Sequence, residues 1–138
     1  MVMNLKPLKG QLLSVLIVED EDDLRDILIP MLQDLEIFSF VVGAVDGKDA
    51  MMKLTNQKFD LVLTDLKLPK LGGLDLARQM KRITSMKDIT VMLMSGSLTV
   101  DDVNECKELG ISAVIAKPFN LDKFKTLLIE NKIARKVT

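Results

Sequence analysis

The chain has 138 residues, 48% of them apolar and only 4% aromatic, which is enough for one domain with an aliphatic core. Its 19 basic and 20 acidic residues leave a net charge of −1, which argues against a nucleic-acid-binding module. The chain has no histidine, which excludes a Ser-His-Asp triad, a histidine metal site and a phosphohistidine, and its single cysteine excludes an internal disulfide and fits the reducing cytoplasm.

The first segment with a clear pattern is the apolar run at residues 13–18, which predicts a strand. This run is too short to span a membrane, and the acidic residues 19–23 follow it in place of a small-residue cleavage site, which argues against a signal peptide. Residues 1–11 show little pattern and are predicted to be an N-terminal tail. We expect one domain at residues 12–131 and a C-terminal tail at 132–138.

Strands and helices are predicted to alternate along the rest of the chain, and three of the helices have a candidate capping residue. Asp22 or Asp23 can cap the first helix, Thr99 the fourth and Asn120 the fifth. The alternation of continuous apolar strands with helices predicts an α/β fold, with a parallel sheet covered by helices on both faces. The expected strands are residues 13–18, 38–45, 61–65, 89–94 and 111–116, and the expected helices are residues 22–35, 50–57, 74–83, 99–109 and 121–128.

Polar side chains stand where four of the five expected strands end. They are Glu19 and Asp20, Asp65, Ser95 and Lys117. Each of them alone is more simply explained as a cap, a turn residue or a solvated charge. All carboxyl ends of a parallel sheet lie at one edge, where open α/β sheets place their ligands, so the four strand ends together predict one site.

The residue types at this edge favour phosphoryl-transfer chemistry. Three carboxylates repel one another unless a cation lies among them, and an oxygen-only set without His or Cys favours Mg²⁺ or Mn²⁺ over zinc. Lys117 supplies a positive charge for a phosphate and Ser95 a hydroxyl donor. The pattern therefore predicts a metal-assisted site with a carboxylate nucleophile.

Four motifs in this order and spacing closely resemble the receiver domain of two-component response regulators. They are residues 18–22, 63–73, 94–96 and 116–119, and the resemblance covers about residues 12–130. It implies a doubly wound, flavodoxin-like (βα)5 fold with a five-stranded parallel sheet in strand order 2-1-3-4-5.

The resemblance also implies a role for each site residue. Asp65 is expected to accept the phosphoryl group, Asp20 to bind the metal directly, and Glu19 to reach the metal mainly through water. Lys67 is expected to offer its backbone carbonyl to the metal. Ser95 matches the family's Ser/Thr position, and Lys117 matches its phosphate-binding lysine, followed by a cis peptide bond to Pro118.

One position departs from the family. Many members have a Tyr or Phe three positions before the lysine, and this ring swings inward when the Ser/Thr moves toward the phosphoryl group. Here the position is Val114, so a ring rotation there is excluded. The Ser95 half of the switch and a shift of the fourth helix stay available.

The resemblance implies a stand-alone switch that takes its phosphoryl group from a sensor histidine kinase or a histidine-phosphotransfer protein. The chain would catalyse its own phosphorylation and dephosphorylation and signal by binding a downstream protein or by passing the phosphate on. No nucleic-acid binding or membrane insertion is expected.

Three other interpretations fit these residues less well. A Mg²⁺-dependent phosphatase of the haloacid-dehalogenase type, with an aspartyl-phosphate intermediate, needs a second aspartate where Lys67 stands. A flavodoxin-like cofactor binder or a P-loop protein needs a Ser-, Thr- and Gly-rich loop after the first strand, and that loop is acidic. A degenerate receiver conflicts with the retention of every residue of the predicted site.

Overall fold

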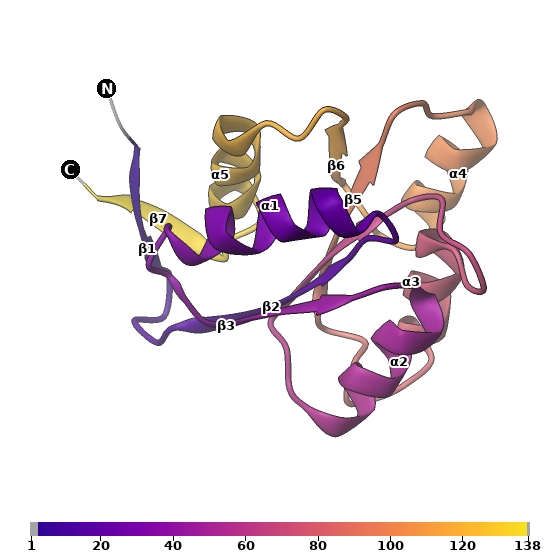
Figure 1. Ribbon diagram of the computed structural model, residues 1–138, viewed down its shortest axis with the longest axis horizontal. Helices are drawn as coiled ribbons and strands as arrows, with labels where there is room; N and C mark the ends of the chain where they lie inside the picture. Colours follow the sequence, from indigo (N-terminus) through magenta and orange to yellow (C-terminus); the bar gives the residue numbers. More distant parts are fainter. Residues whose placement is uncertain (1–2, 138) are drawn as a thin grey trace.

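The computed structural model describes residues 3–137 and contains the predicted five-stranded parallel sheet (Figure 1). Its strand order is β3-β2-β4-β5-β6, which is the order 2-1-3-4-5 when these five strands are numbered alone, so the doubly wound fold is confirmed. The strands are β2 (Leu13–Val18), β3 (Phe38–Ala44), β4 (Leu61–Asp65), β5 (Thr90–Ser95) and β6 (Ala113–Ala116).

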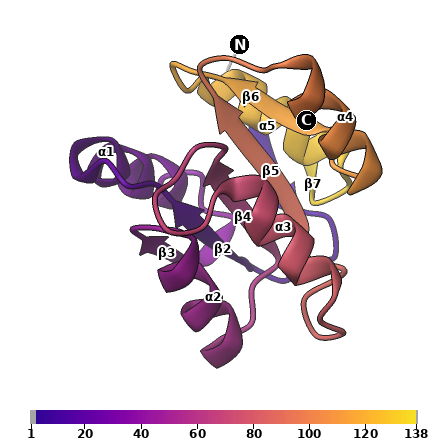
Figure 2. The same cartoon turned by 90° about the vertical axis from the view of Figure 1, so that its right-hand side faces the viewer.

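Helices cover both faces of the sheet and enclose two apolar cores (Figure 2). α1 (Asp22–Gln33) and α5 (Leu121–Glu130) pack on one face, and α2 (Gly47–Asn56), α3 (Gly73–Lys81) and α4 (Val100–Glu108) pack on the other. Because side chains alternate along a strand, Val15 and Ile17 of β2 enter the first core, while Leu16 and Val18 enter the second. All four side chains are fully buried, which explains why the strands are continuous apolar runs.

Two of the predicted helix caps are confirmed and one is wrong. Thr99 forms a capping box with Asp102, and the side chain of Asn120 accepts a hydrogen bond from the amide of Lys123. α1 instead begins after Glu21 without a side-chain cap. Asp22 and Asp23 both lie inside the first turn, past the capping position, and the carboxylate of Asp22 binds the guanidinium of Arg25.

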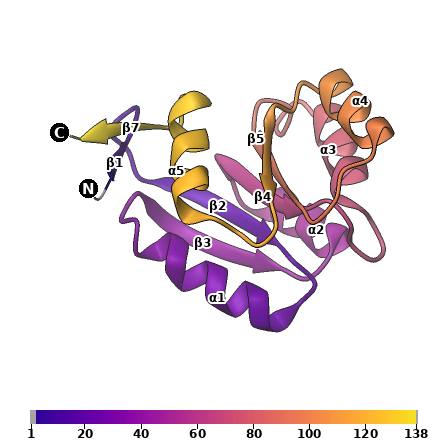
Figure 3. The same ribbon diagram turned by 90° about the horizontal axis from the view of Figure 1, so that it is seen from above.

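The terminal segments predicted to be tails contain two more strands. β1 (Asn4–Pro7) and β7 (Ala134–Val137) pair antiparallel and form a separate two-stranded sheet beside α5 (Figure 3). The amide of Leu8 donates to the carbonyl of Ile133 (3.0 Å), which extends the pairing. The structure therefore corrects the prediction of tails at residues 4–7 and 134–137, while Met1, Val2 and Thr138 lie outside the described residues.

A buried lysine holds the terminal sheet on the domain. Lys125 of α5 is only 8% exposed, and its ammonium donates to the carbonyl of Met3 at 3.1 Å. Such a link between residues far apart in the chain leaves no local signal in the sequence. Among residues 3–137, no helix is long and apolar enough to cross a membrane.

Candidate functional site

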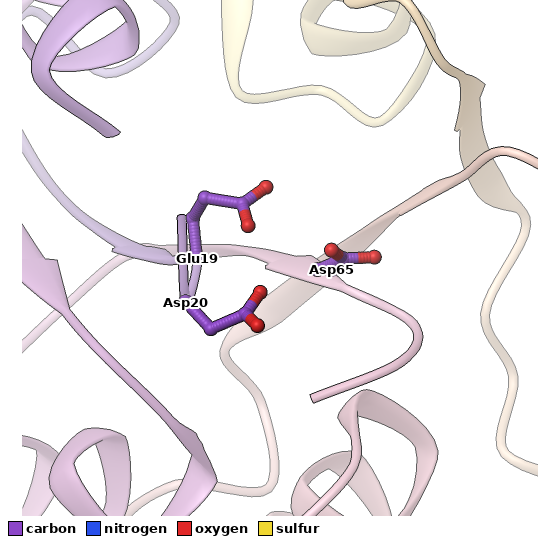
Figure 4. Close-up of side chains that lie close together, drawn as sticks. All are labelled: Glu19, Asp20 and Asp65. Atoms are coloured by element: carbon purple, nitrogen blue, oxygen red, sulfur yellow. The ribbon is translucent and has the colours of Figure 1, made fainter. Parts of the chain in front are cut away.

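Three carboxylates meet at the carboxyl edge of the sheet, as the strand ends predict. Asp65 is the last residue of β4, and Glu19 and Asp20 directly follow β2, the neighbouring strand. One oxygen atom from each carboxylate lies within 4.8 Å of the others, and the side chains of Glu19 and Asp20 extend toward Asp65 (Figure 4). Glu19 is fully buried and Asp65 is 8% exposed, whereas Asp20 is open to solvent, so the cluster can be approached from one side.

Lys117 reaches this cluster from the end of β6. Its ammonium donates to Asp65 Oδ2 at 2.7 Å and to Glu19 Oε1 at 3.2 Å. The backbone amide of Lys117 donates to the carbonyl of Ser95 (2.8 Å), which ties this segment to the end of β5. The peptide bond between Lys117 and Pro118 is cis, as predicted.

The site's burial and charge act on the ionisation of Glu19 and Lys117. Burial raises the pKa of Glu19, and the carboxylates of Asp20 and Asp65 act in the same direction, while hydrogen bonds from the amide of Glu21 and from Lys117 oppose them. Burial alone would lower the pKa of Lys117, but its hydrogen bonds and charge interactions with Asp65 and Glu19 outweigh burial and raise it. Lys117 is therefore a permanent cation that partly neutralises the carboxylates.

The donor set suits a hard divalent ion. Three carboxylate oxygens lie close together, and one ligand, Asp20, faces solvent, where water and a phosphate can complete the shell. The amide of Lys67 donates to Asp65 Oδ1 at 3.4 Å, which brings its backbone to the site. The assignment of its carbonyl as a metal ligand stays a prediction.

Ser95 is the last residue of β5, beside the strand that carries Asp65, but its hydroxyl faces its own loop. Its Oγ donates to the carbonyl of Ser97 at 2.5 Å and accepts from the amide of Ser97 at 3.1 Å. Contact with a phosphoryl group therefore requires a rotation of the Ser95 side chain, and this role stays a prediction.

Arg25 is a part of the site that the sequence analysis missed. Its guanidinium donates to the backbone carbonyl of Glu19 at 2.6 Å and also binds Asp22, so it holds both sides of the acidic loop. Gly43 of β3 leaves room for the Arg25 stem, since an added β-carbon would lie 2.9 Å from Arg25 Cδ. The three-residue spacing of Asp22 and Arg25 on a helix was the available signal.

Val114 borders an apolar cavity of about 540 Å³ beneath α4. The wall also includes Leu98, Val103 and Cys106 from the α4 side and Ile111 from the segment before β6. Open space therefore lies next to the position that carries an aromatic ring in many receivers.

Comparison with known proteins identifies the family. A family model described as "response regulator receiver domain" matches residues 15–129, which is most of the chain. The chain belongs to the response regulator receiver family. Receivers of this family act in two-component systems, bind Mg²⁺, and interact with histidine kinases or phosphotransfer proteins and with downstream targets.

This receiver is similar, over most of its length, to two characterised proteins, each of which it also covers over most of their length. It is 29% identical to the chemotaxis protein CheY of Pseudomonas aeruginosa over 113 residues, which covers 82% of the chain and 90% of that relative. It is 32% identical to sporulation initiation phosphotransferase F of Bacillus subtilis over 112 residues, 81% of the chain and 87% of that relative. The crystal structure of a response regulator receiver protein from Pseudomonas putida superposes with a TM-score of 0.78 at 29% identity, covering 86% of this chain and 97% of that one.

The two acidic residues after β2 are expected to contribute unequally to metal binding by this receiver. Asp20 is exposed and can bind the metal directly, whereas Glu19 is buried and already accepts from Lys117 and from the amide of Glu21. Asp20→Asn should therefore weaken Mg²⁺ binding by about 1–3 kcal/mol, the scale of a charged hydrogen bond, and Glu19→Gln should weaken it less. Calorimetric titration with Mg²⁺ measures both effects, and a larger loss in Glu19→Gln would reverse the two roles.

Gly73 packs directly beneath the Asp65 backbone of the receiver site. A β-carbon added at Gly73 would overlap the carbonyl oxygen of Asp65, while one added at Gly96 meets nothing within 4 Å. Gly73→Ala should therefore lower the free energy of unfolding by about 1–3 kcal/mol, as overpacking does. Urea unfolding of the two alanine variants compares them, and an equal loss in Gly96→Ala would contradict the steric explanation.

Proposed function

We propose that this receiver accepts one phosphoryl group on Asp65, with a divalent cation, Mg²⁺ or Mn²⁺, held by Asp20, Asp65, the Lys67 carbonyl and, through water, Glu19. The observation that supports this most is the ammonium of Lys117, 2.7 Å from Asp65 Oδ2, in a cluster of three carboxylates at the carboxyl edge of the sheet. A nucleophilic carboxylate, a fixed cation and a metal-binding oxygen set are the parts that phosphoryl transfer needs.

The chemical step joins an oxygen of the Asp65 carboxylate to phosphorus and breaks the bond between phosphorus and the leaving group. With a phosphohistidine donor this is the P–N bond, and the imidazole leaves with the electron pair; with acetyl phosphate it is a P–O bond, and acetate leaves. When bound, the metal ion supplies positive charge to the phosphoryl oxygens. Lys117 moves its ammonium from Asp65 to a phosphoryl oxygen, and Ser95 rotates to donate its hydroxyl to another.

The same residues serve the hydrolysis of the aspartyl phosphate. Attack of water on phosphorus breaks the acyl phosphate, releases inorganic phosphate and regenerates the Asp65 carboxylate. The chain thus catalyses its own phosphorylation and dephosphorylation, but its role is that of a switch. Lys67 occupies the position at which a phosphatase of the haloacid-dehalogenase type would need its second aspartate, so that alternative is disfavoured.

The partners follow from this role. The donor is a sensor histidine kinase or a histidine-phosphotransfer protein in the cytoplasm. The output is altered binding of a downstream protein or onward transfer of the phosphoryl group, and no nucleic acid is involved. Similarity to a chemotaxis protein and to a phosphotransferase, each covered over most of its length, supports a stand-alone receiver at residues 12–131.

Acetyl phosphate, a donor that needs no partner, tests this function. With Mg²⁺ the intact mass should rise by one phosphoryl group, and with EDTA in place of Mg²⁺ it should not change. The same uptake with and without the metal ion would contradict a metal-assisted site.

The phosphoryl group is expected to act mainly on the loop after β5 and on α4. The Ser95 hydroxyl must leave its contacts with Ser97 to reach the phosphoryl group, and this loop leads into the Thr99 cap of α4. α4 buries Cys106 but leaves Val100 77% exposed, so it is held less tightly than a core helix. A loop and helix shift suffices for switching without a ring at Val114.

Backbone NMR with beryllofluoride, a stable phosphoryl mimic, measures this response. The largest shift changes away from Asp65 should fall in residues 95–109, with smaller ones in β6 and α5 and little change at Val114. The Asp65→Asn variant is the control and should show no response. Changes confined to α1 and α2 would contradict an output surface on α4, β6 and α5.

A further inference from the structure

A second, separate feature is an apolar groove between α2 and α3, which lie next to each other (Figure 2). Its volume is about 580 Å³. None of its lining residues belongs to the carboxylate cluster or to α4, β6 or α5. The groove is lined by Lys48, Met51, Met52, Lys70, Leu71 and Gln79.

The floor of this groove is built from adaptable apolar side chains. Met51 and Met52 lie three and four residues after Lys48, so the three share one face of α2. Met52 is 62% exposed, and Met51 and Leu71 beside it are partly buried, so the three form an accessible apolar surface. Methionine is flexible and polarisable, which suits a surface that adapts to a partner's side chains.

The rim of the groove is positive. Lys48 is the second residue of α2, and Lys70 lies in the loop between β4 and α3, near Asp46, the N-cap of α2, so both lysines lie at the N-terminal end of this helix. The ammonium of Lys70 is 3.9 Å from Asp46 and its side chain is 69% exposed, so this ion pair is weak and leaves the charge available. An apolar floor with two lysines beside it complements an apolar stripe that has carboxylates next to it.

The groove is physically continuous with the phosphoacceptor backbone. Leu71, one wall of the groove, packs on Gly47 so closely that an added β-carbon at Gly47 would overlap the Leu71 carbonyl. Two residues later, Gly73 packs on the carbonyl of Asp65 in the same manner. Lys70 has a φ of 65°, a left-handed backbone that costs energy in a residue with a side chain. A short, constrained loop therefore connects Asp65 to the groove.

We propose that this groove binds an amphipathic helix of a protein partner, with its apolar face on Met51, Met52 and Leu71 and its carboxylates near Lys48 and Lys70. Laying an amphipathic helix into an apolar groove is a common mode of protein recognition. Two lysines are too few for an anionic membrane surface, which is recognised by clusters of four to eight basic residues. Binding in the groove is linked through the loop to the state of Asp65, and this linkage rests on the proposed function.

Methyl NMR of the protein labelled at its nine methionines tests the docking directly. The probe is a synthetic helical peptide with leucines at positions i, i+3, i+4 and i+7 and glutamates on both flanks. Its control has lysines in place of the glutamates. The Met51 and Met52 methyl signals should shift with the acidic peptide. The affinity for the basic peptide should be at least about fivefold lower, the scale of one or two exposed ion pairs.

Matched variants distinguish specific binding in this groove from nonspecific binding elsewhere on the surface. Lys48→Glu and Met52→Ser should each weaken binding about fivefold to tenfold. Ile27→Ser, at a site 57% exposed on α1, and Lys123→Glu on α5 should leave binding unchanged. The proposal would be overturned by equal binding of both peptides or by shifts of other methionines. It would also be overturned by concentration-dependent shifts without peptide, which would indicate a second copy in the groove, or by a response to anionic vesicles in place of the acidic peptide.

A second titration, with beryllofluoride and Mg²⁺ present, measures the linkage. The affinity for the acidic peptide should change at least about fivefold, the lower end of the usual range of coupling between sites. Equal affinity in both states would overturn the linkage but not the docking. Because the first titration uses unphosphorylated protein, failure of phosphoryl uptake leaves its outcome unaffected.

Discussion

The Asp65→Asn variant is expected to take up no phosphoryl group from acetyl phosphate and Mg²⁺, under conditions in which the wild-type chain takes up one. The amide is a far poorer nucleophile than the carboxylate it replaces, and it removes the anion that Lys117 holds at 2.7 Å. Loss should be complete, because Glu19, the other acidic partner of Lys117, is fully buried and accepts from the amide of Glu21.

Two controls make this result specific. Asp88→Asn, at an exposed aspartate in the segment before β5, should leave phosphoryl uptake unchanged. Thermal unfolding followed by circular dichroism should show that the Asp65→Asn variant is folded, since Asn keeps the size of the side chain. Labelling of this variant equal to that of the wild type would contradict the assignment of Asp65.

Lys117→Ala should have the second largest effect, slowing phosphorylation by roughly 10²–10³-fold, the usual cost of removing one charge-stabilising donor from an active site. The ammonium donates to Asp65 at 2.7 Å and to Glu19 at 3.2 Å. From this position it can neutralise negative charge on the phosphoryl oxygens. The phosphorylation that remains should be uncoupled from partner binding, because the variant lacks the ammonium that links Asp65 to the end of β6.

The rate of phosphorylation by acetyl phosphate measures this effect. Lys117→Arg should recover only part of the rate, because a planar guanidinium is not a compact point charge. Lys123→Ala, at an exposed lysine of α5, is the control and should behave as the wild type. Full activity of Lys117→Ala would contradict the proposed role, and full recovery with Lys117→Arg would show that charge alone is enough.

Most of the sheet and the position of its site could be predicted from the sequence, because both depend on short-range patterns. Buried parallel strands are continuous apolar runs, and Asp65, Glu19 and Asp20 stand where such runs stop, so topology alone brings them to one edge. The caps at Thr99 and Asn120 were also predictable, because capping depends on residues only three apart.

The features that were missed depend on contacts between distant residues or on a competing partner. β1 and β7 pair the two ends of the chain, and their polar residues, such as Lys6 and Arg135, hide the strand pattern. Asp22 and Asp23 fail as caps because α1 begins directly after Glu21, which places both of them inside the first turn. The orientation of the Ser95 hydroxyl depends on its contacts with Ser97, which residue type and spacing do not reveal.

The most direct measurement locates the phosphoryl group on the chain. After reaction with acetyl phosphate and Mg²⁺, borohydride reduces an aspartyl phosphate to homoserine, and trypsin releases residues 59–67, a peptide that contains both Asp60 and Asp65. Tandem mass spectrometry should find homoserine at position 65 and aspartate at position 60. Homoserine at Asp60 or Asp20, or an unmodified residue 65 in a chain that has gained a phosphoryl group, would contradict the assignment of Asp65 as the phosphoacceptor.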